Sequence, residues 1–256
     1  MYVAKAAGCV GCHTEERQGA QPYAGGRALE TPYGIFFGPN ITPHPQAGIG
    51  RWSEQDFIRA MRHGRRPDGA HYYPAFPYPS FTRITEEDLH DLWAYLRGLP
   101  QSSRANQAHD LKLPFGWRWL VWGWKLLFFK PGPFVPDPAR SDVLNRGNYL
   151  VDALGHCGEC HTPRNWLGGP KRARYLAGAK RAEGGAAPNL TPTRLKKLAD
   201  GELKEILETG LTPDGDAVSE SMAEVVENTT SQLTRQDLDA LIAYLRSLPP
   251  LPDEPK

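Results

Sequence analysis

The sequence lacks long hydrophobic runs and has almost no excess of charge. Its most apolar stretch, residues 115–129, is 15 residues long and contains two basic side chains, which is too short for a helix that spans a bilayer. The 30 basic and 29 acidic side chains leave a formal charge of +1. Overall charge therefore gives no general attraction to nucleic acid or to anionic lipid.

Methionine and cysteine are also scarce, with three and four copies among 256 residues. In contrast, the chain contains 26 glycines and 24 prolines, and its mean hydropathy is −0.52. These values predict a loop-rich protein with a modest aliphatic core. Such a chain often needs a disulfide, a metal or a cofactor to stabilise its fold.

The four cysteines occur in two copies of one pattern, "CVGCH" and "CGECH". Two thiols three residues apart, followed at once by histidine, are typical of c-type haem attachment. The sulfurs bond to the porphyrin and the histidine ligates the iron. A redox CxxC, half of a zinc site and a disulfide are the alternatives, but two copies that both include histidine favour two covalently attached haem c groups. The predicted haem-binding residues are Cys9, Cys12, His13, Cys157, Cys160 and His161.

Repeated phrases indicate that one module is used twice. "NITP" at Asn40 returns as "NLTP" at Asn189, and "LWAYLRGLP" at Leu92 returns as "LIAYLRSLP" at Leu241. "RPDG" similarly returns as "TPDG". The segment ahead of the second haem motif has one extra residue relative to the first. We therefore predict two cytochrome domains, residues 1–105 and 141–256, joined by a Trp- and Pro-rich linker, residues 106–140.

Each module is predicted to be mostly helical, because no alternating strand pattern is evident. Ser53, Thr85 and Thr234 each precede an amphipathic segment and are predicted N-caps. Further helices are expected to lead into both haem motifs. The predicted fold class is all-α, with short helices and long loops around covalent haem.

Longer phrases resemble a particular protein family. The sequences of residues 31–57, 66–85 and 145–165 are similar to phrases of the multihaem cytochrome c subunits of bacterial membrane-associated alcohol, aldehyde and gluconate dehydrogenases. This resemblance covers nearly the whole chain and implies two tandem class I cytochrome c domains. It also implies export to the periplasm and a redox partner protein. Family members often contain three haems, whereas this chain has motifs for two.

The resemblance also implies a methionine as the second axial ligand of each iron. Met222 lies in the expected loop of the second module, seven residues after Gly215. The same count from Gly69 reaches Phe76, so the first module has phenylalanine where the family usually has methionine. We expect an open iron there, with His71 as the alternative ligand. Met61 is expected to pack in the core.

The linker allows two interpretations. Its tryptophans and leucines could form a patch that contacts a membrane or a partner dehydrogenase, or a strap that packs across the two modules. The strap is favoured, partly because Arg118 and Lys125 interrupt the apolar sequence.

Two classes of function are consistent with these motifs. The first is a carrier of single electrons, from a dehydrogenase or quinol towards a cytochrome or oxidase. The second is a haem enzyme or ligand-binding protein, peroxidase-like or gas-binding, that uses an open iron in the first module. The carrier is favoured, because no acid–base pair lies beside Phe76 in the sequence. We expect periplasmic location, with possible attachment to the cytoplasmic membrane through the linker or an upstream anchor, because module two continues upstream of the position that matches Met1.

Overall fold

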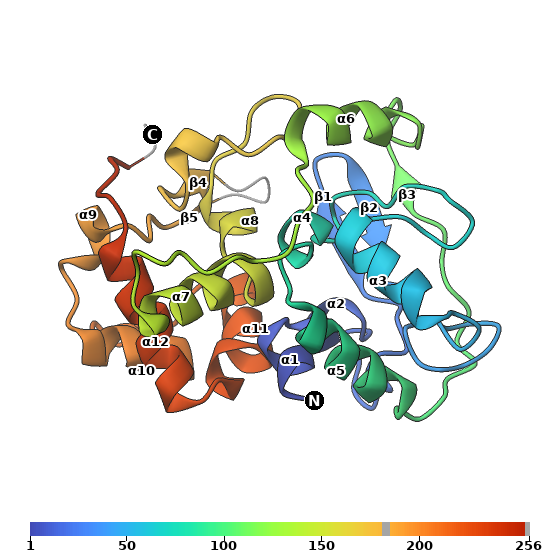
Figure 1. Ribbon diagram of the computed structural model, residues 1–256, viewed down its shortest axis with the longest axis horizontal. Coiled ribbons are helices and arrows are strands. Elements are labelled where there is room, and N and C mark those ends of the chain that lie inside the picture. The colour runs from blue at the N-terminus through green and yellow to red at the C-terminus, as the bar shows by residue number, and fades with distance from the viewer. Residues whose placement is uncertain (181–184, 254–256) are drawn as a thin grey trace. The chain divides into compact units, whose positions relative to one another are not determined.

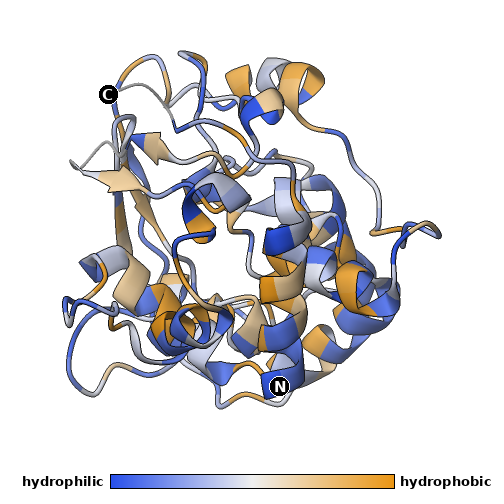
Figure 2. Ribbon diagram, turned by 90° about the vertical axis from the view of Figure 1, so that its left-hand side faces the viewer, coloured by the Kyte–Doolittle hydropathy of each residue, from blue (hydrophilic) through white to orange (hydrophobic). Residues whose placement is uncertain are grey.

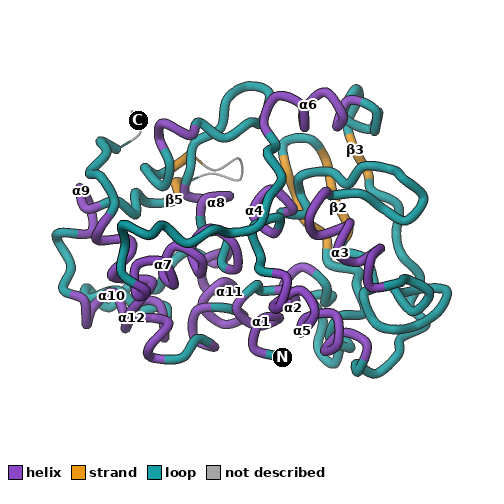
Figure 3. The backbone as a smooth tube through the Cα atoms, viewed as in Figure 1, coloured by secondary structure: helices purple, strands orange, loops and turns teal. Residues whose placement is uncertain are grey.

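The computed structural model describes residues 1–180 and 185–253, and it divides into two compact units, Met1–Pro133 and Phe134–Lys256 (Figure 1). Each unit contains one CxxCH motif. Short helices alternate with long loops throughout (Figure 3). Residues 106–133, which were predicted to belong to a linker, pack as part of the first unit.

The regular elements of the first unit are mainly helices, separated by long loops. Its helices are α1 (Tyr2–Ala6), α2 (Cys9–Cys12), α3 (Glu54–His63), α4 (Tyr78–Phe81), α5 (Glu86–Arg97) and α6 (Leu120–Phe128). Helices α1 and α5 pack against each other, as do α3 and α5. In Figure 1, α1, α2 and α5 gather at one side of this unit and α6 lies at the opposite side.

A small antiparallel sheet in this unit corrects the all-α prediction. Strand β1 (Ala28–Thr31) pairs with β2 (Gly34–Phe37), which pairs with β3 (Asp110–Leu111). The strands are at most four residues long, and too short to show a clear alternation of polar and apolar residues. The fold is therefore mostly helical, with small sheets that the sequence pattern could not reveal.

The predicted helix starts are confirmed. The Ser53 hydroxyl accepts a hydrogen bond from the Asp56 amide, and the Asp56 carboxylate accepts one from the Ser53 amide, which completes a capping box. The hydroxyls of Thr85 and Thr234 cap α5 and the last helix of the chain in the same way, each at 3.2 Å. These contacts satisfy amide groups that a helix start leaves without partners.

The second unit repeats this design. Its main helices are α7 (Asp142–Tyr149), α8 (Gly158–His161), α9 (Pro192–Leu195), α10 (Asp200–Thr209), α11 (Glu220–Asn228) and α12 (Arg235–Ser247). Its shorter elements are the 3₁₀ turns Arg172–Arg174 and Thr230–Gln232 and the strand pair β4 (Ala179–Lys180) and β5 (Ala186–Ala187). The apolar side of α12 is buried, while polar residues line its other side. Hydrophobic and hydrophilic residues alternate along the helices in the same way in Figure 2.

The extra residue ahead of the second haem motif is accommodated by a π-helical turn, Leu150–Leu154. The Gly155 amide donates to the Leu150 carbonyl at 2.7 Å, five residues back. In the first unit, the Ala7 amide donates to the Val3 carbonyl, four residues back. A π-bulge absorbs one inserted residue without breaking a helix, so both modules deliver their cysteines after a continuous helical turn.

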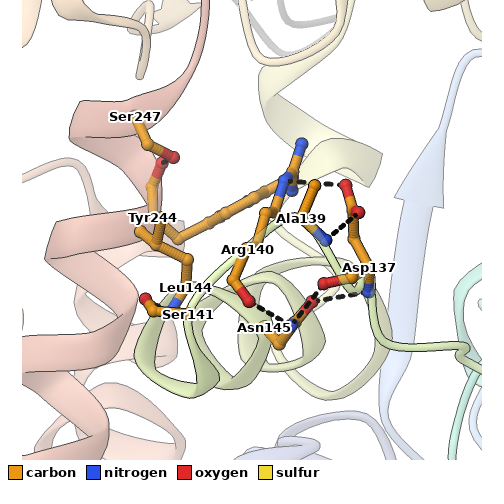
Figure 4. A network of polar contacts seen from close by, with 8 residues as sticks. All are labelled: Asp137, Ala139, Arg140, Ser141, Leu144, Asn145, Tyr244 and Ser247. Atoms are coloured by element: carbon orange, nitrogen blue, oxygen red, sulfur yellow. Dashed lines mark hydrogen bonds and ion pairs between the residues drawn. The ribbon is translucent and has the colours of Figure 1, made fainter.

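Helices α7 and α12 form the main packing contact of the second unit. A Cβ on Gly147 would lie 2.0 Å from the Ala240 carbonyl oxygen, so only glycine allows the two backbones to approach this closely. The start of α7 is fixed by Asn145, whose side chain bonds both the amide and the carbonyl of Asp137 (Figure 4). These contacts hold the helix that leads to the second haem motif.

Candidate haem sites

The first CxxCH motif forms the short helix α2, and His13 follows at its end. The His13 Nδ1 atom lies 2.7 Å from the Pro39 carbonyl oxygen. Because a carbonyl can only accept, Nδ1 carries the proton and the lone pair remains on Nε2. Burial lowers the pKa of His13, although the hydrogen bond to Pro39 opposes that shift. The imidazole is therefore held neutral and oriented, as a metal-ligating histidine requires.

The second motif repeats this geometry. The His161 Nδ1 atom lies 2.7 Å from the Pro188 carbonyl oxygen, and the ring is buried. Pro39 and Pro188 occupy the same place in the repeated phrases "GPNITP" and "APNLTP". The repeated phrase is visible in the sequence, but its contact with the haem-motif histidine is not. In both units it supplies the carbonyl that sets the histidine tautomer.

A hydroxyl contact that was not predicted from the sequence is also duplicated. The residue after each histidine is a threonine, and its hydroxyl accepts the amide of Tyr23 in the first unit (3.1 Å) and of Leu176 in the second (3.0 Å). Both loops that donate these amides pass through left-handed backbone at Tyr23 and Leu176, with φ of 64° and 58°. Such strain in non-glycine residues is uncommon and clusters at functional sites. The sequence signal for this contact was the threonine that follows the histidine in both motifs.

Asparagine side chains hold the repeated phrases in place. The Asn40 amide group donates to the Ser102 and Arg104 carbonyls, and its oxygen accepts from the Thr42 amide. In the second unit, Asn189 likewise accepts from the amide of the threonine two residues on and donates to a carbonyl, that of Leu251. Both asparagines are buried. Their contacts tie each histidine's carbonyl partner to the segment that follows α5 in the first unit and α12 in the second.

The cysteine environments argue against redox chemistry at the thiols. Burial raises the pKa of the Cys9 thiol to about 12, and the neighbouring Cys12 adds to the shift. Burial, Cys160 and Asp152 raise the pKa of Cys157 to about 12 as well. Redox CxxC motifs lower their thiol pKa instead. All four cysteines are within the described residues, and none forms a disulfide.

The donor set of each unit fits covalent haem. In the first unit both thiols stand on α2 and His13 follows directly, whereas in the second Cys157 precedes α8, which contains Cys160 and His161. Each histidine keeps its lone pair on Nε2. Among residues 1–180 and 185–253, no group of three or more His, Cys, Asp or Glu side chains is placed to hold a metal ion. A zinc site at either motif would thus lack further protein ligands, whereas a porphyrin brings its own nitrogens.

The loops expected to supply the second axial ligand have the same backbone frame in both units. Helices α3 and α10 end at Gly64 and Gly210, both with left-handed backbone. The amide eight residues further on returns to that glycine's carbonyl, at 2.9 Å in the first unit and 2.8 Å in the second. Phe76 and Met222 each follow the glycine by twelve residues. This frame supports the match between the two positions.

Phe76 lies within a cluster of aromatic rings. Its ring centroid is 5.3 Å from that of Tyr72, 6.3 Å from that of Tyr78 and 5.7 Å from that of Phe81. Burial raises the pKa of Tyr72 to about 12, so this phenol is neutral at ordinary pH. Met222 lies in the first turn of α11 and is partly exposed. Met61 is buried on α3 beside Phe57 and Ala60, as expected for core packing.

His71 is engaged by the segment that follows the first cytochrome module. Its Nδ1 atom lies 3.0 Å from the Lys125 ammonium, and its carbonyl accepts from Arg118 at 2.7 Å. Lys125 also donates to the Gly64 carbonyl at 3.0 Å and to that of His63. Burial lowers the pKa of His71, and Lys125 and Arg65 add to this shift.

Comparison with known proteins agrees with this geometry. The Cytochrome c family model matches residues 2–100 and 144–249, one match for each unit. The chain belongs to the cytochrome c family. Because each match includes a CxxCH motif, it is a dihaem c-type cytochrome, with two covalently attached haem c groups, and an electron-transfer protein.

Individual proteins of known name are also similar to this chain. The chain is 45% identical to a diheme cytochrome c-type protein of Cereibacter sphaeroides, over 95% of this chain and 83% of that protein. It is 42% identical to the fructose dehydrogenase cytochrome subunit of Gluconobacter japonicus, over 97% of this chain and 51% of that subunit. It is 37% identical to the gluconate 2-dehydrogenase cytochrome c subunit of Pantoea cypripedii, over 96% of this chain and 58% of that subunit. The chain thus spans only about half of these dehydrogenase subunits.

Proposed function

We propose that the chain passes single electrons from a dehydrogenase towards a terminal acceptor in the periplasm. The observation that supports this best is the duplicated histidine setting, in which His13 and His161 each bond a prolyl carbonyl at 2.7 Å. Two equivalent sites in one chain suit electron transfer between them. The relatives named as cytochrome subunits of fructose and gluconate dehydrogenases support a dehydrogenase as the donor.

The residues that hold haem follow from the site geometry. Cys9 and Cys12 would form the thioether links in the first unit, and Cys157 and Cys160 those in the second. His13 and His161 would ligate iron through Nε2, because Nδ1 of each ring is already engaged. Bound haem supplies one-electron chemistry at its iron. The polypeptide's part is to orient both imidazoles, and in the first unit burial also lowers the pKa of His13.

The two units differ in the second axial ligand. Met222 would supply a thioether in the second unit, which favours ferrous iron and raises the potential. Phe76 has no lone pair and cannot ligate, so the first iron would be open behind an aromatic cover. The contacts of His71 with Lys125 and Arg118 hold this histidine on the side of α6. They favour the open iron over ligation by His71.

Carbon monoxide tests this assignment. The reduced protein should bind it at about one site per chain, because Met222 occupies the other iron. Phe76→Met should close that site, and Phe76→Leu is the matched control that removes the ring without adding a ligand. Carbon monoxide binding at neither haem of the wild type would contradict the open iron. Rapid turnover of hydrogen peroxide by the wild type, lost in Phe76→Met, would instead favour a haem enzyme.

A further inference from the structure

The outer side of α6 is strongly apolar. Trp119, Trp122, Leu126 and Leu127 have exposed fractions of 57–69%. Trp117, just before the helix, is 52% exposed. Single exposed apolar residues are ordinary on a protein surface, but a contiguous group marks an interaction site.

The basic residues of this segment do not interrupt the group. Lys125 is buried and contacts the end of α3, with its ammonium 4.6 Å from the centre of the Tyr78 ring. Arg118 lies over the Tyr73 ring at 4.5 Å. Both side chains turn into the unit and leave the tryptophans and leucines on the outside. The prediction that these two charges break the apolar patch is therefore wrong.

A basic hollow of about 530 Å³ adjoins the apolar side of α6. Trp122 and Leu126 form part of its wall, and Arg59, Arg65 and Lys125 add positive charge. Arg59 is also within 3.5 Å of Asp56. Burial lowers the pKa of His63, and several surrounding cations, Lys125 first, lower it further. The hollow thus combines an excess of positive charge with an apolar margin.

The surrounding sequence has the same sign of charge. Residues 111–136 contain four lysines and arginines and no aspartate or glutamate. Exposed tryptophan is favoured at the boundary between water and lipid, and basic side chains are attracted to anionic headgroups. Within the described residues, no helix is long and apolar enough to cross a membrane. The contact would therefore lie along a membrane surface.

We propose that this side of the first unit docks on an anionic phospholipid bilayer. The phosphate of one lipid would enter the hollow between Arg59 and Arg65, and Trp119, Trp122 and Leu126 would insert among the neighbouring lipids. The surface uses none of the haem-binding residues. Failure of this proposal would therefore leave the electron-transfer assignment intact, and failure of the ligand assignment would leave the docking surface intact.

Vesicle sedimentation of the haem-loaded protein tests the proposal. Wild-type protein should sediment with vesicles of equal parts phosphatidylcholine and phosphatidylglycerol and remain in solution with phosphatidylcholine alone. Trp119→Ser/Trp122→Ser should abolish binding. Trp166→Ser is the matched control, because Trp166 is 88% exposed in the second unit. Absorbance spectra like that of the wild type would show that the variants keep both haem sites.

A second pair of variants tests how much the basic residues of the hollow contribute to vesicle binding. Arg59→Gln/Arg65→Gln should weaken partitioning about 25-fold at low salt, since each basic residue near an anionic surface contributes about fivefold. Arg51→Gln/Arg235→Gln removes the same charge from other exposed positions and should bind as the wild type does. No sedimentation of wild-type protein with the anionic vesicles would overturn the proposal. The proposal would also be overturned if either control variant, Arg51→Gln/Arg235→Gln or Trp166→Ser, lost as much vesicle binding as the variant it is matched to. Undiminished vesicle binding by Trp119→Ser/Trp122→Ser would overturn it as well.

Discussion

The loop that ends at Phe76 and the loop that ends at Met222 have the same backbone frame and different chemistry. Each begins at a left-handed glycine, turns through an isolated β-bridge, and returns an amide to that glycine's carbonyl. The bridge pairs Arg65 with His71 in the first unit and Leu211 with Ala217 in the second. The frame does not depend on the side chain at this position, so under the proposed ligand assignment one substitution is enough to change the axial ligand of a duplicated module.

The first loop receives extra support from the segment after its cytochrome module. The Tyr73 hydroxyl donates to the Gly116 carbonyl at 3.1 Å, and the Gly132 amide donates to the Thr82 hydroxyl at 3.0 Å. Lys125 and Arg118 contact His71 between these two points. A bond from methionine to iron would pin such a loop to the haem. Under the proposed ligand assignment, these contacts would replace that bond in the first unit.

The largest effect is expected when one haem is removed at a time, because each remaining haem can then be studied alone. Cys157→Ala/Cys160→Ala should leave one covalent haem with the open-iron spectrum of the first unit. Cys9→Ala/Cys12→Ala should leave one haem with the methionine-ligated spectrum of the second. Intact mass after acid–acetone extraction counts the haems, and the wild type should retain two. A double-cysteine variant that still retains two covalent haems would contradict the attachment sites.

Exchange of the ligand residues would test whether one side chain sets the difference. Met222→Ala should abolish the weak near-infrared band of a methionine-ligated ferric haem and lower that haem's potential. Phe76→Met should create a second such band and raise the potential of the first haem. Axial ligands span roughly 0.8 V of potential, so both shifts should be well resolved by optical titration. Survival of the band in Met222→Ala would show that Met222 is not the ligand.

The sequence predicted the repeated parts of this molecule well and the partner groups poorly. The haem motifs, the helix caps and the Phe76–Met222 match were all visible, because each depends on local spacing. The carbonyls of Pro39 and Pro188 were not predicted, since a backbone acceptor leaves no trace in residue type. The effect of Lys125 on the apolar patch was predicted wrongly, because its inward position depends on its contacts with the His63 and Gly64 carbonyls at the end of α3 and not on its apolar neighbours in sequence.

The buried lysine should make the stability of the first unit depend on pH. Burial, with a smaller effect of Arg65, lowers the pKa of Lys125 to about 8, against roughly 10.4 in an unfolded chain. Between these values the unfolded state binds more protons, so the free energy of unfolding should rise with pH. The full rise should be about 3 kcal/mol.

Urea denaturation at a series of pH values, followed by absorbance of the first haem in the Cys157→Ala/Cys160→Ala background, measures this dependence. Lys125→Met should flatten the slope between about pH 8 and 10. Lys130→Met, at an exposed position two residues after α6, should keep it. Equal slopes in the wild type and in Lys125→Met would show that the pKa of Lys125 is not lowered in the folded protein.

The smallest effect is expected at His71, and it decides between the two models of the first iron. Since Nδ1 of His71 already accepts from Lys125 and its carbonyl is fixed by Arg118, His71→Ala should leave the optical spectrum and carbon monoxide binding unchanged. The lost hydrogen bond should lower the free energy of unfolding by about 1 kcal/mol. His71→Gln retains an acceptor towards Lys125 and serves as the control. If the wild type shows a low-spin bis-histidine spectrum that His71→Ala converts to high spin, His71 ligates the iron despite these contacts, and the open-iron model is wrong. An unchanged spectrum in both variants would leave Phe76 alone over the iron, and the difference between the two units would then rest on one aromatic side chain.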